Sequence, residues 1–147
     1  MDLIIYDNGN GGELSLKNGD LEVTDGLLNM PYLSHFGGNL EASTTGNEEE
    51  NQERFDWWGN EFLDPENQMN SELERALNEN ALNSSGRINI ERASNKDLES
   101  LSDLANVSSE VVITGNNKLK ISDKIEKNVV NMLWDATKNE LIEEIII

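Results

Sequence analysis

Two stretches with the pattern of a β-hairpin most constrain how this chain can fold. In the first, "ELSLKNGDLEV", Leu14 and Leu16 alternate with polar residues before Asn18-Gly19, and the alternation resumes afterwards. Asn-Gly favours a two-residue hairpin turn because both residues tolerate positive φ angles. The second stretch, "VVITGNNKLKI", places a Gly-Asn-Asn turn between two alternating runs. The sequence therefore predicts an N-terminal hairpin and a C-terminal hairpin, the latter with strands at 107–114 and 118–126.

Segments between the two hairpins show helical spacing of apolar residues. Residues 27–36 repeat an apolar residue every three positions, which suits a short helix or an irregular segment. A helix is expected from Asp64 as N-cap and Pro65 as the first helical residue. A further helix should carry the apolar residues between 90 and 105, with Gly86 as a break near its start. Two or three helices are therefore expected.

The C-terminal part is less distinctive. "NVVNMLWDATK" is apolar enough for either a helix turn or a strand, and "ELIEEIII" favours a short strand. With 147 residues the chain should form a single domain. The predicted fold class is α+β, with a small antiparallel sheet made of the N-terminal and C-terminal hairpins and packed on the helices. Residues 38–53 are expected to form a mobile acidic loop, and 137–147 a β-prone tail.

Charge limits the classes of partner. The chain has 29 acidic and 11 basic residues, a net charge of −18, and no cysteine. Nucleic acids and anionic membranes are disfavoured because their phosphates require clustered Lys and Arg. The absence of cysteine excludes a disulfide framework and a thiolate metal site. No secretory signal is recognisable at the start, so we expect a protein made in the cytoplasm of its host cell.

Motifs for catalysis are lacking. His35 is the one histidine, and a Ser-His-Asp site through it has no supporting motif, so we expect it to pack at the edge of the core. "DNGNGGE" lacks the carboxylate spacing of a calcium loop. The acidic run "NEEENQE" lacks the pocket that would separate two carboxylate pKa values in a glycosidase. We therefore predict no catalytic, cofactor-binding or metal-binding residues and no enzymatic activity.

The paired tryptophans in "RFDWWGNEF" are the most unusual local feature. Trp57 and Trp58 before Gly59 fit a core anchor that also contributes to a subunit interface. An alternative is a carbohydrate-binding or adhesion module that stacks the two rings on sugars. At the C-terminus, Ile145, Ile146 and Ile147 would either complete this protein's own sheet or add a strand to a neighbour's.

The order of these motifs resembles that of the Mu-like phage baseplate protein family, which is related to the T-even baseplate wedge protein that initiates the tail sheath. The resemblance covers residues 13–136 and rests on "NGDLEVTDGLL", "PYLSHFG", the acidic loop, "RFDWWGNEF", "LERA", the hairpin "VVITGNNKLKI" and "MLWD". The family shows an Arg-Gly-Trp-Trp-Gly-Asp-like motif at the Trp pair. Asp56 and Asn60 here replace its Gly and Asp.

The resemblance implies a structural protein of a contractile tail baseplate, in a phage or a phage-like particle. Its partners would be other wedge proteins, the central hub or spike, and the tail sheath protein, with six copies in each particle. Strand exchange with the first sheath ring would use the sheet edges at 107–114, 118–126 and 140–147. The candidate interface or anchor residues are Trp57, Trp58, Gly59, Val111, Ile113, Leu119, Ile121, Ile145, Ile146 and Ile147.

Overall fold

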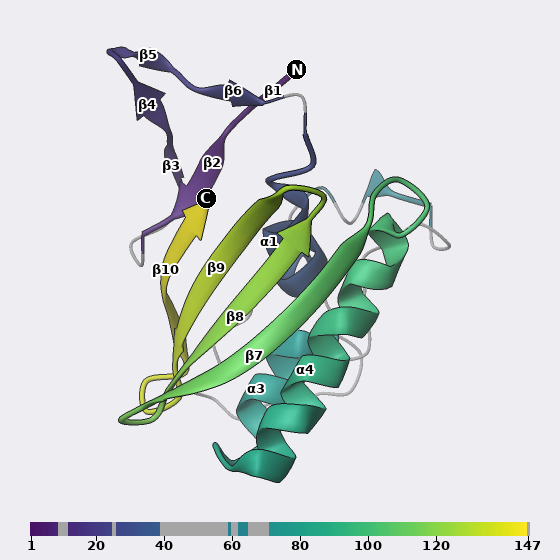
Figure 1. Cartoon of the computed structure of the whole chain (residues 1–147), viewed down its shortest axis with the longest axis vertical. Helices are drawn as coiled ribbons and strands as arrows, with labels where there is room; N and C mark the ends of the chain where they lie inside the picture. The colour runs from purple at the N-terminus through teal and green to yellow at the C-terminus, as the bar shows by residue number, and fades with distance from the viewer. Residues whose placement is uncertain (9–11, 25, 39–58, 60–61, 65–70, 147) are drawn as a thin grey trace.

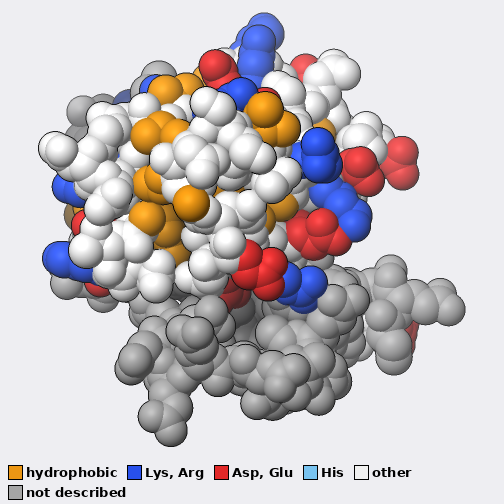
Figure 2. Space-filling view, turned by 90° about the horizontal axis from the view of Figure 1, so that it is seen from below, with side chains coloured by type: hydrophobic (Ala, Val, Ile, Leu, Met, Phe, Trp, Pro, Cys, Tyr) orange, Lys and Arg blue, Asp and Glu red, His pale blue; other side chains and the backbone are white. Residues whose placement is uncertain are grey.

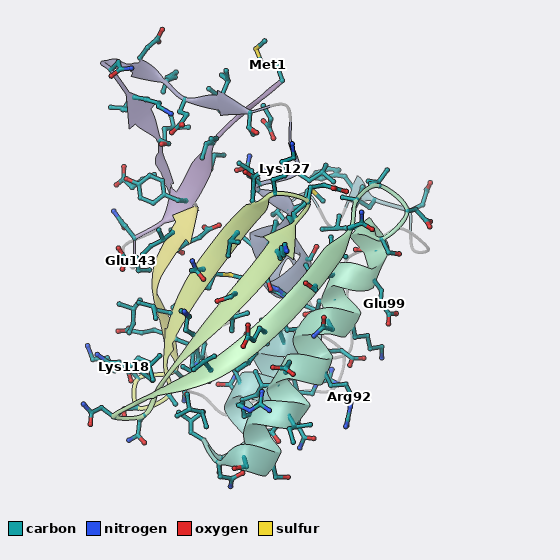
Figure 3. The ribbon with its side chains drawn as sticks, in the orientation of Figure 1. Met1, Arg92, Glu99, Lys118, Lys127 and Glu143 are labelled. Atoms are coloured by element: carbon teal, nitrogen blue, oxygen red, sulfur yellow. The ribbon has the colours of Figure 1, made fainter. Side chains whose placement is uncertain are left out.

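The computed structural model of the chain describes residues 1–8, 12–24, 26–38, 59, 62–64 and 71–146. These residues form an α+β fold, as predicted, with helices on one face of a four-stranded antiparallel sheet and a set of short β-ribbons at the N-terminus (Figure 1). The expected acidic loop at 38–53 lies almost wholly outside the described residues. No helix in the described ranges is long and apolar enough to cross a membrane.

The main sheet is an up-and-down meander in the order β10-β9-β8-β7. Its strands are β7 (Val107–Gly115), β8 (Lys118–Ile125), β9 (Asn128–Asp135) and β10 (Glu140–Ile146). Asn116, Asn117, Glu126 and Asn139 adopt positive φ angles in or beside the turns that join the strands. The predicted C-terminal hairpin is therefore confirmed, and two further strands continue it.

The ambiguous segment "NVVNMLWDATK" forms strand β9. Val130, Met132 and Trp134 are fully or almost fully buried and alternate with half-buried residues, which is the period of a strand with one face on the core. The side chain of Trp134 stacks on Phe36 of α1 (Met30–Phe36), with ring centroids 6.3 Å apart. This contact joins the sheet to the helical layer, and the cluster around it is completed by Leu73, Leu77, Ile90, Val111, Leu119, Ile121 and Leu141.

Helix α3 (Leu73–Glu79) covers the C-terminal part of the predicted helix, and the predicted first helical residue, Pro65, lies outside the described residues. Asp64 lies outside the helix, residues 65–70 are not among those described, and Ser71 and Glu72 are not helical. The Ser71 amide and hydroxyl instead donate hydrogen bonds to the carbonyls of Gly38 and Ser34. The helix starts at Leu73 because a distant carboxylate, described below, satisfies its first backbone N–H groups.

Helix α4 (Ser84–Leu98) is followed by a 3₁₀ turn, η2 (Glu99–Leu101). The prediction that Gly86 marks a break is wrong, because Gly86 lies in the first turn of this helix. Its amide donates a hydrogen bond to the Asn83 side chain. A Cβ atom at Gly86 would lie 1.8 Å from the carbonyl oxygen of Ala81, so this position needs glycine for space. The predicted extension to Leu104 is also wrong, because the helix ends at Leu98 and Leu104 is exposed.

The N-terminal strands form three short antiparallel ribbons. β1 (Asp2–Leu3) pairs with β6 (Val23–Thr24), β2 (Ile5–Asp7) with β3 (Gly12–Leu14), and β4 (Leu16–Lys17) with β5 (Asp20–Leu21). The last of these ribbons turns at Asn18-Gly19, where both residues have positive φ, so the predicted turn is confirmed. The ribbons extend beyond the end of the main sheet instead of lying in it (Figure 1).

Candidate functional site

The predicted interface residues divide between the two faces of the main sheet. Val111, Leu119 and Ile121 are buried beneath the helices, and Ile113 is half-buried. Ile145 lies on the opposite face and is exposed. Gly59 is buried, whereas Trp57, Trp58 and Ile147 lie outside the described residues and only the backbone of Ile146 is described. The sugar-platform alternative, which depends on the Trp pair, therefore stays a prediction.

Helix α4 covers the outer edge of strand β7. The Asn95 side chain accepts a hydrogen bond from the Ser109 amide and donates one to its carbonyl, each 2.9 Å long. Val111, two residues further along, also points its backbone N–H and carbonyl to this outer edge. Its N–H donates a hydrogen bond to Glu91, and its carbonyl accepts one from Arg87. Three side chains thus occupy the positions that a neighbouring strand would take. The prediction of an open edge at 107–114 is corrected for this part of the strand.

Strand β8 is an interior strand of the sheet, which corrects the second predicted edge at 118–126. It is hydrogen-bonded to β9 on one side in a continuous register, and to β7 on the other side with one bulge, between Ile113 and Gly115. Its backbone groups therefore have partners within the protein. The sequence showed two hairpin strands but not the third strand that pairs beside them.

Strand β10 ends the sheet on the other side. Within the described part of the chain no strand is hydrogen-bonded to its outer edge. A bulge lies between Leu141 and Glu143, and beyond it Ile145 pairs with Asn131 on the uncovered face of the sheet. The C-terminal end of β10 contacts strand β2, and the Asp7 amide of β2 donates a hydrogen bond to Glu144 Oε2 at 3.1 Å. This edge is the candidate site for an added strand.

A buried polar cluster around His35 was not predicted. The ring of His35 is fully buried at the end of α1, between Asp97 of α4 and Asp123 of β8. Nδ1 lies 3.2 Å from Asp97 Oδ2, and Nε2 lies 2.7 Å from Asp123 Oδ2. Ionised carboxylates only accept hydrogen bonds, so both ring nitrogens donate and the imidazole is a cation. The two carboxylates are the partners that stabilise this buried charge.

The electrostatics of the cluster agree with its geometry. Burial by itself would lower the pKa of His35, but the charges and hydrogen bonds of Asp123 and Asp97 outweigh it and raise the pKa to about 9. Asp97 also accepts hydrogen bonds from the backbone amides of Glu72 and Leu73, at 2.7 and 3.0 Å. The Asp97 carboxylate therefore caps the N-terminus of helix α3. The cluster connects three helices with the sheet.

Ser94, His35 and Asp97 superficially match a Ser-His-Asp arrangement, with Ser94 Oγ 3.4 Å from Nε2. Two observations argue that the cluster is structural. Nε2 donates to Asp123 and so has no lone pair to take a proton from the hydroxyl. Ser94 is fully buried and shares a 2.6 Å hydrogen bond with Ser109. His35 is therefore buried inside the core and not at its edge, as was predicted. In the described ranges, no group of three or more acidic, His or Cys residues could hold a metal ion.

The sequence does carry a faint signal for this cluster. Asp123 occupies an inward position of the alternating strand that buries Leu119, Ile121 and Ile125. Asp97 lies four residues after Ala93, on the buried face of α4. A carboxylate in phase with core positions requires a buried partner, and His35 is the one histidine available.

Glu144 is the second buried carboxylate with an unusual environment. It lies on the core face of β10, opposite Met132, and among the described residues only its Oε2 has a hydrogen-bond partner. Burial raises the pKa of Glu144 to about 7; the Asp7 amide bond opposes this shift, and the charges of Asp7 and Asp123 add to it. Glu144 therefore contributes a group that titrates near neutral pH at the contact between β10 and the N-terminal ribbons.

Comparison with known proteins gives no further guidance. No family model, no curated protein and no solved structure matches this chain.

Proposed function

We propose that this chain is a structural subunit of a contractile tail baseplate, of the wedge or sheath-initiator type, in a phage or phage-like particle. It would link the central hub and neighbouring wedge proteins to the first ring of the tail sheath, with six copies in each particle. The proposal rests on the order of sequence motifs described above. The observation that best supports it is the contrast between the two edges of the main sheet.

The two edges differ in what a partner strand would find. At β7, Asn95, Glu91 and Arg87 already satisfy the outward backbone groups of two residues, so a new strand would have to displace them. At β10, the outer edge carries no strand in the described residues. An added strand gains a row of backbone hydrogen bonds there without breaking any that the described residues make. Strand exchange should therefore use β10.

A matched pair of substitutions tests this. Ile145 on β10 and Val112 on β7 are both β-branched aliphatic residues. They are 41% and 40% exposed, and both lie on the uncovered face of the sheet. A lysine near a sheet edge discourages strand pairing. Ile145→Lys should reduce the ability of the protein to nucleate polymerisation of its particle's sheath protein, measured by electron microscopy. Val112→Lys should nucleate as the unmodified protein does.

Equal nucleation by the two variants, with both folded, would contradict the use of the β10 edge. No effect of the unmodified protein on sheath polymerisation would contradict the proposed function itself.

A further inference from the structure

The three N-terminal ribbons meet at a closed ring of backbone hydrogen bonds. Ile4 donates its N–H to the carbonyl of Glu22, Glu22 donates to Ser15, and Ser15 donates to Ile4, at 2.8–2.9 Å. Each of these residues lies between two strand segments that pair with different neighbours. The ribbons therefore form one connected unit, residues 2–7, 12–17 and 20–24, which we call the N-terminal platform.

The register of the ribbons places six apolar residues on one face of the platform. The pairs are Leu3 with Val23, Ile5 with Leu14, and Leu16 with Leu21. Residues directly opposite one another in a ribbon share a face, and so do residues two apart along a strand. The residues of the central ring point to the other face, where the Ser15 hydroxyl donates to Glu22 and Ile4 is buried.

This apolar face is exposed. Leu16 is 69% exposed, Val23 is 50%, Ile5 and Leu14 are 46%, and Leu21 is 44%. They make up five of the larger exposed apolar side chains in the described residues, gathered on one small unit. Contiguous exposed apolar side chains with polar groups around them typically mark a binding surface.

The platform is held in place before any partner binds. The Asn29 side chain accepts a hydrogen bond from the Ile5 amide and donates one to the Leu3 carbonyl, at 3.1 and 2.7 Å. The Asp7 amide donates to Glu144, and the Tyr32 hydroxyl donates to the Asp7 carboxylate. A partner would therefore meet a preformed surface, which lowers the entropic cost of binding.

Charge decides which partner fits. Residues 1–24 contain five carboxylates and one lysine, and the whole chain carries a net charge of −18. A second copy of this chain would bring two strongly acidic surfaces face to face. We propose that the platform docks a segment of another protein that presents aliphatic side chains together with Lys or Arg. The aliphatic side chains would cover the apolar face. The basic groups would be attracted by the carboxylates of the same ribbons, of which Asp7 shares the apolar face and Asp2, Glu13, Asp20 and Glu22 lie on the opposite face. This inference does not depend on the proposed baseplate function.

The test uses the full chain and two synthetic peptides as probes. One peptide alternates leucine with lysine, and the other alternates leucine with glutamate. With the basic peptide we expect NMR amide shift changes in the platform, weakened by added salt, and no binding of the acidic peptide. Leu16→Ser combined with Leu21→Ser should lower the affinity for the basic peptide by at least about tenfold, because two large apolar contacts are lost.

Leu104→Ser is the matched control, because Leu104 is similarly exposed and lies outside the platform. Shift changes spread over the molecule, or an affinity that the double variant leaves unchanged, would overturn the proposal. So would sedimentation showing a self-association that the double variant abolishes, since the occupant would then be a second copy. Should the double variant unfold, Leu16→Ala removes the most exposed contact alone, and an unchanged affinity there would equally overturn the proposal.

Discussion

The Nε2 atom of His35 lies 2.7 Å from Oδ2 of Asp123, and both side chains are fully buried. The carboxylate of Asp97 approaches the other ring nitrogen. A buried cation with two carboxylates is stable only while each group retains its partners. This arrangement, which joins α1, α4 and β8, gives the fold its most distinctive electrostatic property.

The pKa of His35 can be measured directly, because the chain has one histidine and its imidazole signals are unambiguous. An NMR titration should show a midpoint near 9 and not near 6.5. Asp123→Asn should lower the midpoint, since it removes the charge of the nearest carboxylate. Asp103→Asn, at an exposed position, should leave it unchanged. A midpoint near 6.5 in the unmodified protein would show that the ring is not a buried cation.

The same cluster should make stability depend on pH in the alkaline range. The pKa of His35 is about 9 in the folded state and ordinarily 6.5, so the folded state holds the proton more tightly. Its contribution is complete below pH 6.5 and is lost as the pH rises to about 9. We expect the free energy of unfolding in urea to fall by on the order of 3 kcal/mol across this window. His35→Gln should lack this fall, although its overall stability will be lower.

Glu144 acts with the same sign in a more acidic window. Its pKa is raised from 4.5 to about 7, so the folded state keeps the proton that the unfolded chain releases above pH 4.5. The penalty for the buried charge therefore appears between pH 4.5 and about 7 and persists above it. Glu144→Gln should increase stability by about 3 kcal/mol at pH 8 and change it little at pH 4.

The adjacent Glu143 provides the control for that comparison, because its side chain is exposed. Glu143→Gln should alter stability little at either pH. If Glu144→Gln changes the free energy of unfolding by the same amount at pH 4 and pH 8, the carboxylate is not buried in its charged form. The environment assigned to Glu144 is then wrong.

Gly86 should not tolerate a larger side chain. Its Cβ would lie 1.8 Å from the Ala81 carbonyl oxygen and 3.0 Å from its carbonyl carbon, both backbone atoms that cannot rotate away. Gly86→Ala should therefore destabilise the protein by about 1–3 kcal/mol or more, despite the better helix propensity of alanine. Ser85→Ala, at the adjacent exposed position, is the control in thermal unfolding. A stabilised Gly86→Ala would mean that the close approach does not exist.

Local features of the fold could be predicted from sequence where the local chemistry is decisive. Asn18-Gly19 and the Gly-Asn-Asn turn adopt the positive φ angles that only a few residues accept, so both hairpins were predictable. Segment 30–36 forms a helix that accepts Pro31 because it lies in the first turn. In these cases the signal and its structural consequence lie within a few residues of one another.

Other features depend on partners that are distant along the chain. His35 meets Asp97 and Asp123 across 62 and 88 residues, so its neighbours in sequence, Leu33 and Phe36, indicated only an apolar environment. The start of α3 at Leu73 depends on Asp97 and not on the local candidate Asp64. The closed edge of β7 depends on side chains of α4. Sequence patterns predict the helices and strands, but tertiary contacts determine the environment of His35, the start of α3 and the closed edge of β7.

Asn95 gives a direct test of the closed edge. Its amide group pairs with both backbone groups of Ser109, so Asn95→Ala would leave an N–H and a carbonyl of β7 without these partners. We expect the protein to lose about 1–3 kcal/mol of stability and the Ser109 amide to lose protection in hydrogen exchange. The newly opened edge should also promote self-association at high concentration, measurable by sedimentation.

Asn89 is the matched control, because it lies on the same helix and its side chain bonds to Asn80 at an exposed position. Asn89→Ala should change neither the protection of Ser109 nor the sedimentation behaviour. If Asn95→Ala keeps Ser109 protected, then α4 does not close this edge, and β7 becomes as plausible as β10 for the addition of a partner strand.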